Sequence, residues 1–322
     1  MFGSKGAKIL DRIETVRSVG PFLRNELSLN PNIELVGGVR FDNIRFGLED
    51  HFLADGDQSG SITLSAWSGT AGAVWHLNST HHLYANFATA FETPTSTELI
   101  NHPTGGPGFN TDLKAQNSLN YEIGAKGVGG FGYQVSLFYI LSKDEIVPFE
   151  IAAFPGRSFF RNAGKSVRKG FEAALNYSPA KNLETRLSYT YSDFKFTEFV
   201  AEGRDLAGND IPGIPTHRFF ASLDYKHPQG WFSRFNLQHV GSFFVDDQNS
   251  LKSNSYTLAD LFLGYEGKAG LYRWTVFFGF KNLLNETYNS NIRINAFGGR
   301  FFEPGPPFNI FAGVTLAFVS PD

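Results

Sequence analysis

The amino-acid sequence predicts an all-β protein, an antiparallel transmembrane β-barrel of which about 13 to 14 strands are present. Three observations lead to this fold class. The chain is rich in aromatic residues, with 34 Phe, 12 Tyr and 4 Trp among 322 residues, although its mean hydropathy is −0.19. Apolar and polar side chains alternate along many segments, and the connections between these segments are alternately short and long.

The aromatic content is unusual for a chain of slightly polar average hydropathy. It is expected where strands place one face in lipid and carry aromatic belts at both interfaces. A soluble β-sandwich or β-propeller with a phenylalanine-rich core is the alternative that composition leaves open. A propeller would show a sequence repeat of about 40–45 residues, and we find no such repeat.

The rest of the composition excludes several kinds of site. Cysteine is absent, which excludes disulfides and thiolate metal sites, and the single Met argues against a thioether copper site. The formal net charge is −3, so nothing indicates nucleic-acid binding. We therefore expect no cofactor, no metal site and no nucleic-acid partner.

Strict alternation of two faces marks the predicted strands. In the clearest case, Phe219, Leu223 and Tyr225 alternate with Asp224 and Lys226. The full set of candidate strands is 21–29, 33–47, 62–77, 81–91, 119–126, 132–147, 158–177, 183–191, 219–226, 231–238, 256–265, 273–281 and 308–318. Many approach the roughly 9–11 residues that cross a bilayer at a tilt, and the polar face would line a wet lumen.

Tight turns alternate with long polar loops along the whole chain. The turns fall at 30–32, 78–80, 127–130, 178–181, 227–230 and 266–270, and the loops at 48–61, 92–116, 148–157, 197–215, 242–255 and 286–307. This pattern is typical of short periplasmic turns and long external loops. The last strand follows a loop and therefore runs inward, as does 21–29. Residues 1–20 are expected to hold a partial, outward strand or part of an external loop.

Helical membrane segments and a signal peptide are not predicted. No run of about 18 apolar residues occurs. Residues 1–18 contain no apolar stretch of the kind a signal peptide requires. We therefore expect the chain to be a mature, an engineered or a partial form of an exported protein.

Five motifs resemble those of the TonB-dependent outer-membrane receptors. In chain order they are Phe91-x-x-Pro94-x-x-x-Glu98-Leu99; Asn120, Tyr121, Glu122, Ile123 and Gly124; Asn162 and Gly164 followed by Gly170, Phe171 and Glu172; Pro215, His217 and Arg218; and Lys281, Asn282, Leu283, Leu284 and Asn285. The resemblance covers roughly residues 20–318. Members usually end on an aromatic residue, whereas here Phe318 is followed by four more residues.

The resemblance implies a fold and a location. Members are similar to a barrel of roughly 22 strands in the bacterial outer membrane, filled by an N-terminal plug that follows a TonB-contacting box. Neither plug nor box is present here, so the chain resembles the C-terminal part of the barrel. The expected division is 1–20 as a partial strand or external loop, 21–318 as barrel and 319–322 as a C-terminal tail.

The resemblance also implies a function. It is TonB-dependent uptake of a scarce nutrient, with a ferric siderophore as the default and cobalamin, haem or a glycan as open alternatives. The implied partners are membrane lipid, lipopolysaccharide, a small metal chelate, and TonB through an N-terminal region that this chain lacks.

The motif residues are expected to be structural rather than ligand-contacting. Gly124 and Gly164 suit bulges or close backbone approach, and Glu122, Arg168 and Glu172 would face the lumen. The whole set is Phe91, Pro94, Glu98, Leu99, Tyr121, Glu122, Gly124, Asn162, Gly164, Gly170, Glu172, Asn282, Leu283 and Phe318.

Ligand contacts are expected from the external loops and the upper lumen. Arginine and aromatic side chains suit an anionic, aryl-bearing metal chelate through ion pairing and stacking. The competing interpretation is that the same side chains form an interfacial belt and contact lipopolysaccharide. The candidates are His102, Phe109, Phe154, Arg157, Arg300, Phe301 and Phe302.

No enzymatic activity is predicted. The eight His are scattered, and the nucleophile-elbow, zinc-protease and phosphate-loop motifs are absent. His81 and His82 are adjacent in sequence, without the spacing of a metal-binding pair. The alternative functions are a passive porin, which would conduct ions in a planar bilayer, and a structural barrel without energised transport.

Overall fold

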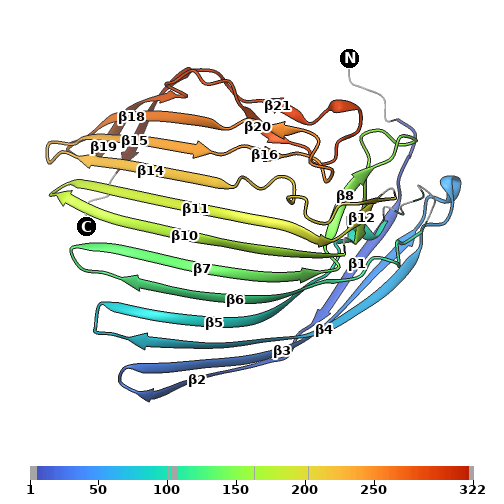
Figure 1. Ribbon diagram of the computed structural model, residues 1–322. Helices are drawn as coiled ribbons and strands as arrows, with labels where there is room; N and C mark the ends of the chain where they lie inside the picture. The colour runs from blue at the N-terminus through green and yellow to red at the C-terminus, as the bar shows by residue number, and fades with distance from the viewer. Residues whose placement is uncertain are drawn as a thin grey trace.

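The computed structural model of the protein describes residues 6–100, 102, 104, 108–162, 164–201 and 203–318. One curved antiparallel sheet of 14 strands dominates the chain, which confirms the predicted fold class (Figure 1). Its strands are β1 (Arg12–Val19), β2 (Phe22–Asn30), β3 (Ile33–Asp50), β4 (Gly60–His76), β5 (His81–Glu92), β6 (Gln116–Gly127), β7 (Phe131–Lys143), β10 (Lys165–Ala180), β11 (Leu183–Glu198), β14 (His217–Lys226), β15 (Trp231–Val240), β18 (Tyr256–Ala269), β19 (Tyr272–Lys281) and β22 (Asn309–Phe318).

Apart from β1 and β2, which both pair with β3, consecutive strands of the sheet are neighbours joined by antiparallel ladders. The tight turns lie at the left end of the sheet in Figure 1, and the loop elements β8, β12, β16, β20 and β21 lie toward the right. The alternation of short and long connections that the sequence shows therefore corresponds to two ends of one sheet. Within the described ranges, no helix has the length and apolar content needed to span a membrane.

The N-terminal region differs from the expected outward strand. β1 pairs with residues 43–50 of β3, and β2 pairs with residues 33–40 of the same strand. β1 is thus the upper continuation of β2, interrupted at Gly20 and Pro21, because proline cannot donate to the ladder. Residues 319–322, predicted as a tail, lie outside the described residues.

Two predicted strands are shorter than expected. The segments 132–147 and 158–177 do not cross as single strands, because the ladder of β7 and β10 ends where the Asp144 N–H donates to the Gly164 carbonyl at 2.9 Å. Asp144 adopts φ +56°, which turns the chain out of the sheet. The remaining ends of both segments form a separate hairpin, β8 (Ile146–Glu150) and β9 (Ser158–Asn162), within the loop.

The other long loops also contain small elements that the sequence did not predict. They are η1 (Leu53–Asp55), α1 (Ser96–Ile100), the pair β12 (Val200–Ala201) and β13 (Arg204–Asp205), the pair β16 (Phe243–Phe244) and β17 (Lys252–Ser253), and β20 (Asn289–Ile292), η2 (Phe297–Gly299) and β21 (Phe302–Pro304).

The two faces of the sheet have different chemistry. One face carries large apolar side chains in the open, such as Trp67 and Val314, which are 69% and 73% exposed. Near the turns this face has an aromatic row that includes Trp231, Tyr265 and Trp274, with ring centroids 4.7 and 5.2 Å apart. Such a row is typical of a membrane interface. The opposite face carries charged side chains such as Arg186 and Asp224 along its strands and corresponds to the lumen.

Glycines of the sheet are covered by aromatic rings from the neighbouring strand. A Cβ added to Gly124 would stand 2.5 Å from Cζ of Tyr84, its ladder partner. The same relation joins Gly170 to Phe138, Gly264 to Phe232, Gly267 to Trp274, Gly279 to Phe311, and Gly313 to Phe277. The ring fills the space left by the absent side chain, so glycine is required for the ring to lie flat on the sheet.

Buried apolar side chains concentrate at the loop end. One cluster joins Phe46 and Leu48 of β3 to Leu99 and Ile100 of α1, together with Phe109 and Leu113. A second cluster joins Val147, Phe196, Phe199, Ala201 and Leu206. Away from the loop end, the described residues of the sheet form no comparable cluster, because one face is apolar toward lipid and the other is wet.

The sheet has two free edges, β1–β2 and β22. Both edge strands run from the loop end to the turn end, and no ladder joins them among the residues described. If β22 paired directly with the β1–β2 edge, the two strands would be parallel, because both run in the same direction. Closure of the sheet by antiparallel ladders alone therefore needs an odd number of further strands between these two edges. Unpaired backbone groups cannot face lipid, so these edges require a partner in a membrane.

Replacing Gly124 by Val should destabilise the sheet by about 1–3 kcal/mol, because the new side chain displaces the Tyr84 ring. Thermal unfolding and heat-modifiable gel migration measure the effect. The matched control is Gly129→Ala in the turn, where an added Cβ meets nothing within 4 Å. Equal behaviour of the two variants would contradict the packing role of Tyr84.

The free edge should be visible in hydrogen exchange of this chain in detergent micelles. Amides on the unpaired side of β22 should exchange roughly tenfold or more faster than those of β10 and β11 in mid-sheet, because only the latter are bonded on both sides. Protection of that side of β22 would show that the two edges join in a parallel seam.

Candidate functional site

Four external loops interlock at the loop end of the sheet. Asn295, in loop 282–308, is the central connection. Its amide donates to the Pro148 carbonyl at 2.9 Å and to Oδ2 of Asp247 at 3.0 Å, while its Oδ1 accepts the Asp247 N–H at 2.9 Å. One side chain thereby ties loops 144–164, 241–255 and 282–308 together.

A second connection brings in loop 199–216. The Asn249 amide donates to the Asp210 carbonyl and accepts the Asp210 N–H, at 2.9 and 2.7 Å. Asn209 donates to the Asp247 carbonyl at 2.8 Å. Asn249 and Asn295 both have φ +55°, a conformation in which asparagine is favoured.

The interlocked loops enclose a cavity of about 230 Å³. Its walls combine aromatic, basic and acidic side chains from all four loops. The lining residues are Phe149, Glu150, Arg161, Ala201, Leu206, Asp246, Asp247, Gln248, Ser250, Asn295, Ala296 and Phe301.

Glu150 is a buried anion in the wall of this cavity, with its side chain 5% exposed. Its carboxylate meets Arg293 at 3.4 Å and Arg300 at 3.5 Å and accepts the Gly156 N–H at 3.0 Å. Removing Glu150 would leave two cations without this partner. The arrangement holds the tip of the β8–β9 hairpin against loop 282–308.

Arg161 lies between two aromatic rings. Its guanidinium carbon is 4.7 Å from the Phe149 ring centre and 5.4 Å from that of Phe199. Its terminal nitrogen is 3.9 Å from Oδ2 of Asp247. The stacking orients a cation toward the cavity, where it faces a buried carboxylate.

Asp247 is buried, with 4% of its surface exposed. Burial raises its pKa above the ordinary value for aspartate, and the hydrogen bond from Asn295 and the charge of Arg161 oppose this only in part. Its Oδ1 has no hydrogen-bond partner among the described residues. The carboxyl group is therefore a proton-sensitive point in the loop cluster.

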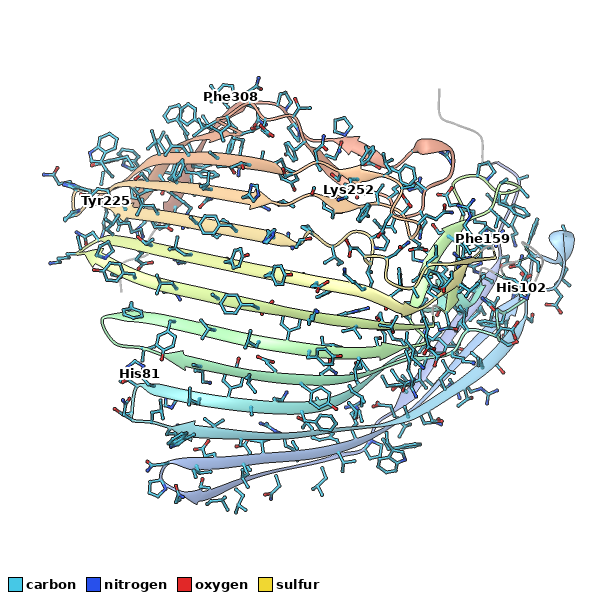
Figure 2. All side chains as sticks on the ribbon, in the orientation of Figure 1. His81, His102, Phe159, Tyr225, Lys252 and Phe308 are labelled. Carbon is cyan, nitrogen blue, oxygen red and sulfur yellow. The ribbon has the colours of Figure 1, made fainter. Side chains whose placement is uncertain are left out.

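The predicted ligand contacts fall into two groups. Phe301 lines the cavity, and Arg300 pairs with Glu150 in the cavity wall. Arg157 stacks on Phe154 and Phe159 in the neighbouring hairpin, at 5.8 and 5.0 Å from the ring centres. Figure 2 labels Phe159 at this end of the sheet. Phe302 is the first residue of β21, and its ring centre is 6.1 Å from that of Phe301.

The other two candidates lie in loop 93–115. His102 Nδ1 is 2.8 Å from the Thr104 hydroxyl. Phe109 is only 8% exposed and packs with Leu99 and Leu113. Its burial argues against the ligand contact predicted for it, because its ring surface is already occupied.

The motif that contains Pro94, Glu98 and Leu99 shapes the start of α1. The Glu98 carboxylate accepts the Thr95 N–H at 2.7 Å, and the Thr95 hydroxyl accepts the Glu98 N–H at 3.3 Å. This reciprocal pair is a capping box. Pro94 and Leu99 are fully buried beneath it, and Phe91 lies in β5 before it.

The motif around Glu122 acts across two strands. The Glu122 carboxylate accepts a hydrogen bond from the Tyr84 hydroxyl at 2.6 Å, which holds the ring over Gly124. On the opposite face, Tyr121 contacts Phe87 with ring centres 5.1 Å apart.

Asn162 and its neighbours connect loops to the sheet. The Asn162 amide accepts the Lys114 N–H at 2.8 Å and donates to the Asp144 carbonyl at 2.7 Å. Gly164 and Gly170 both approach neighbouring backbone so closely that an added Cβ would collide with a carbonyl oxygen. Glu172 is exposed on the lumenal face of β10.

Asn282 organises the start of the last loop. Its N–H donates to Asp260 at 2.9 Å, its amide donates to the Glu286 carbonyl at 2.9 Å, and its Oδ1 accepts the Glu286 N–H. Leu283 donates its N–H to the Ala259 carbonyl. Phe318 lies at the end of β22, with its ring centre 5.8 Å from that of Tyr272.

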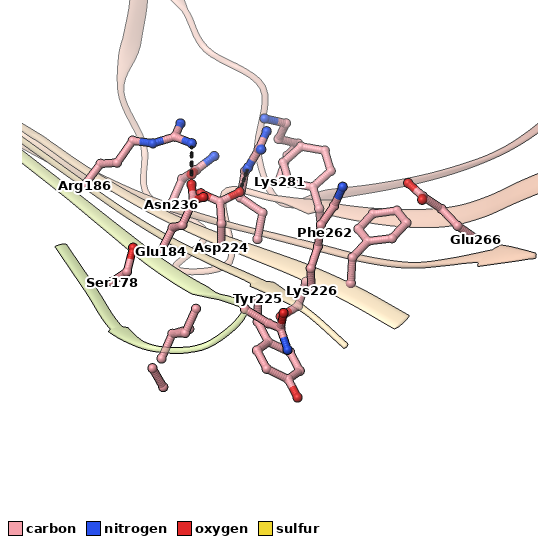
Figure 3. A pocket seen from close by; sticks show the side chains of 16 residues that line it. Ser178, Glu184, Arg186, Asp224, Tyr225, Lys226, Asn236, Phe262, Glu266 and Lys281 are labelled. Carbon is pink, nitrogen blue, oxygen red and sulfur yellow. Dashed lines mark hydrogen bonds and ion pairs between the residues drawn. The ribbon is translucent and has the colours of Figure 1, made fainter. Parts of the chain in front are cut away.

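A larger cavity of about 820 Å³ lies on the lumenal face near the turns (Figure 3). Its wall carries side chains of both charges, in which Arg186 contacts Glu184 at 3.1 Å and Arg234 forms an ion pair with Asp224. Lys281 meets Asp260 at 2.6 Å nearby. These pairs satisfy one another, so the surface is polar with nearly balanced charge.

Sequence reasoning missed a contact between His76 and His82. The two side chains meet across the hairpin at 2.7 Å between their Nδ1 atoms. The short turn at 77–80 could have predicted this contact, because it places His76 and His82 opposite each other in the ladder. No group of three or more His, Cys, Asp or Glu is placed to hold a metal in the described part of the chain.

The sheet, its aromatic row and its loop-filled end have counterparts among known proteins. A family described as "TonB dependent receptor-like, beta-barrel" matches residues 2–283. The chain belongs to this family. The family is one of transport receptors rather than enzymes.

Curated relatives are similar to this chain over only part of their length. The catecholate siderophore receptor Fiu of Escherichia coli (strain K12) is 24% identical over 332 aligned positions, covering 91% of this chain and 40% of the relative. The pesticin receptor of Yersinia enterocolitica is 25% identical, covering 74% of this chain and 35% of the relative. The chain thus spans less than half the length of these relatives.

Solved structures share the fold. The ferric-catecholate import receptor Fiu from K12 E. coli, in its closed form, superimposes with a TM-score of 0.71 at 16% identity, over 95% of this chain and 45% of the other. The siderophore receptor PiuA from Acinetobacter baumannii gives 0.76 at 16% identity, over 95% and 44%.

The raised pKa of Asp247 predicts a pH-dependent loop cluster. The folded state holds this proton more tightly than the unfolded state, so the stabilisation is complete below the unfolded pKa and is lost as pH rises through the folded pKa. Asp247→Asn should remove this dependence, measured by hydrogen exchange of 241–255 corrected for intrinsic rates.

Asp57→Asn is the control, because the pH dependence that Asp57 contributes has the opposite sign to that of Asp247. Hydrogen bonds from Ser59 lower the pKa of Asp57, so its contribution is present above the unfolded pKa and is lost as pH falls through the folded pKa. An unchanged pH response in Asp247→Asn would contradict the assignment to Asp247.

Proposed function

We propose that this chain is the C-terminal barrel portion of a bacterial outer-membrane receptor for TonB-dependent uptake of a ferric siderophore. The observation that carries the proposal is the external loop cluster, where Phe301 lines a cavity, Arg300 pairs with Glu150 in the cavity wall, and Arg157 stacks on Phe154 in the adjoining hairpin. Cationic and aromatic groups together suit an anionic aryl chelate.

The relatives support the choice of ligand class. Those matched by sequence are described as receptors for catecholate siderophores, for pesticin and for ferrioxamine. A ferric catecholate, with its aromatic rings and negative charge, fits the stacked arginines of the β8–β9 hairpin better than a neutral ligand would.

The remaining partners follow from the same proposal. Lipid would cover the apolar face of the sheet, and lipopolysaccharide would meet its loop end. Contact with TonB, and energised transport as a whole, would involve parts of the receptor beyond this chain.

Ligand uptake by the whole receptor tests the loop cluster. Arg157→Ala and Phe301→Ala should each weaken apparent affinity for a ferric tricatecholate by about tenfold, the loss of roughly 1.4 kcal/mol of contact. Uptake of radioactive iron measures the affinity. Lys114→Ala, which removes an exposed cation from a different external loop, is the matched control.

Unchanged uptake in the Arg157→Ala, Phe301→Ala double variant would contradict the proposed contact. Planar-bilayer recording separates the receptor from a pore, because large and stable openings of the receptor without ligand would favour passive diffusion.

A further inference from the structure

A second cluster of functional side chains lies at the opposite end of the sheet from the loops. It comprises His76, the last residue of β4, His82 near the start of β5, and Glu34 of β3. Glu34 is opposite Val74 and His76 is opposite His82, so all three side chains point to the lumenal face. None of them belongs to the loop cluster.

The two imidazoles face each other through the same ring atom. Their Nδ1 atoms are 2.7 Å apart and their ring planes cross at 86°. Two Nδ1 atoms without a hydrogen would repel at this distance, so either one imidazole carries its hydrogen on Nδ1 and donates it to the other, or a metal ion lies between the two.

Glu34 selects which nitrogen of His76 is available. Its Oε1 lies 3.3 Å from Nε2 of His76, on the side of the ring away from His82. A carboxylate there holds the proton on Nε2 and leaves the Nδ1 lone pair directed at His82. This is the carboxylate–histidine relation that orients imidazole ligands in metal sites.

The spacing is compatible with a divalent ion after a small side-chain movement. Metal–imidazole bonds of about 2.0–2.1 Å separate two nitrogens by roughly 2.9 Å at a right angle and roughly 3.3 Å at a tetrahedral angle. The observed 2.7 Å must open by a few tenths of an ångström. Both rings are half-buried and face the lumen, so rotation of χ angles supplies this movement without moving the backbone.

The chemistry of the donors selects the ion. Neutral imidazole favours Cu²⁺, Ni²⁺ and Zn²⁺ over Mg²⁺ and Ca²⁺. Because the described residues provide only these two nitrogen ligands here, water would fill the other positions and the ion would exchange readily. Lys126 is opposite His82 on β6, so its charge on one side offsets that of Glu34 on the other.

We propose that His76 and His82 form a two-imidazole site for a divalent transition-metal ion on the lumenal face beside the tight turns, with Glu34 as the positioning residue. The site is separate from the proposed chelate contact at the loops, and the proposal does not depend on the proposed uptake function.

Binding of Cu²⁺ alone and of Zn²⁺ alone to the full chain in detergent tests the site. Titration calorimetry gives the affinity, and electron paramagnetic resonance of bound Cu²⁺ should show two coordinated imidazole nitrogens. His76→Asn and His82→Asn should each weaken binding at least tenfold. Glu34→Gln should weaken it by roughly 10–100-fold, as expected for an orienting partner.

His81→Asn is the matched control. His81 lies beside His82 but belongs to the other face of the sheet, with Nδ1 3.2 Å from the Tyr133 hydroxyl. Its variant should bind Cu²⁺ as the parent does. Heat-modifiable gel migration checks that every variant keeps the parent fold. If His76→Asn fails to fold, His76→Gln is the second substitution.

Two outcomes would overturn the proposal. Equal loss of Cu²⁺ binding in His81→Asn would show a surface histidine effect rather than a site. If neither Cu²⁺ nor Zn²⁺ binds in a stoichiometric amount, the two imidazoles are joined only by a hydrogen bond.

Discussion

The structure depends on one constraint, that every backbone N–H and C=O within lipid needs a partner from the protein. An antiparallel ladder meets this requirement along each strand, and direct connections between neighbouring strands are the simplest way to give every strand its partners. The sheet order of this chain follows the sequence for that reason. The same constraint makes the edges, β1–β2 and β22, the places where the described chain is incomplete as a membrane surface.

A sheet that faces lipid on one side and water on the other cannot build its core between two layers. The buried apolar residues therefore collect at the loop end, where Phe46 and Leu48 meet α1 and where Phe196 meets the β12–β13 hairpin. Asparagine side chains and the ion pairs of Glu150 supply further connections, because an amide can both donate to and accept from the backbone of another loop. The loops consequently form a packed unit around the cavity rather than separate mobile segments.

The candidate site was only partly predictable. Arginine and aromatic residues in long external loops indicated a ligand-facing surface, which stays a prediction; Phe301 lines the cavity, and Arg300 pairs with Glu150 in its wall. Phe109 has the same chemistry in the sequence, yet it is buried against Leu99. Glu150, Arg161 and Asp247 were not predicted, because nothing local distinguishes a loop carboxylate that will be buried from one that stays in water. His76 and His82 were missed because their contact depends on hairpin register rather than on spacing along the chain.

The sequence by itself determined the strands, their two faces and the alternation of turns and loops, since a period of two and the turn residues are local properties. It also determined the family, through short motifs that can be read along the chain, one of which forms the local capping box at Thr95 and Glu98. Only the tertiary structure decided which loops meet. Asn295 binds the Pro148 carbonyl 147 residues away, and Arg300 meets Glu150 at a separation of 150. Such contacts arise because the curvature of the sheet brings the ends of distant strands together, and no local pattern encodes that curvature.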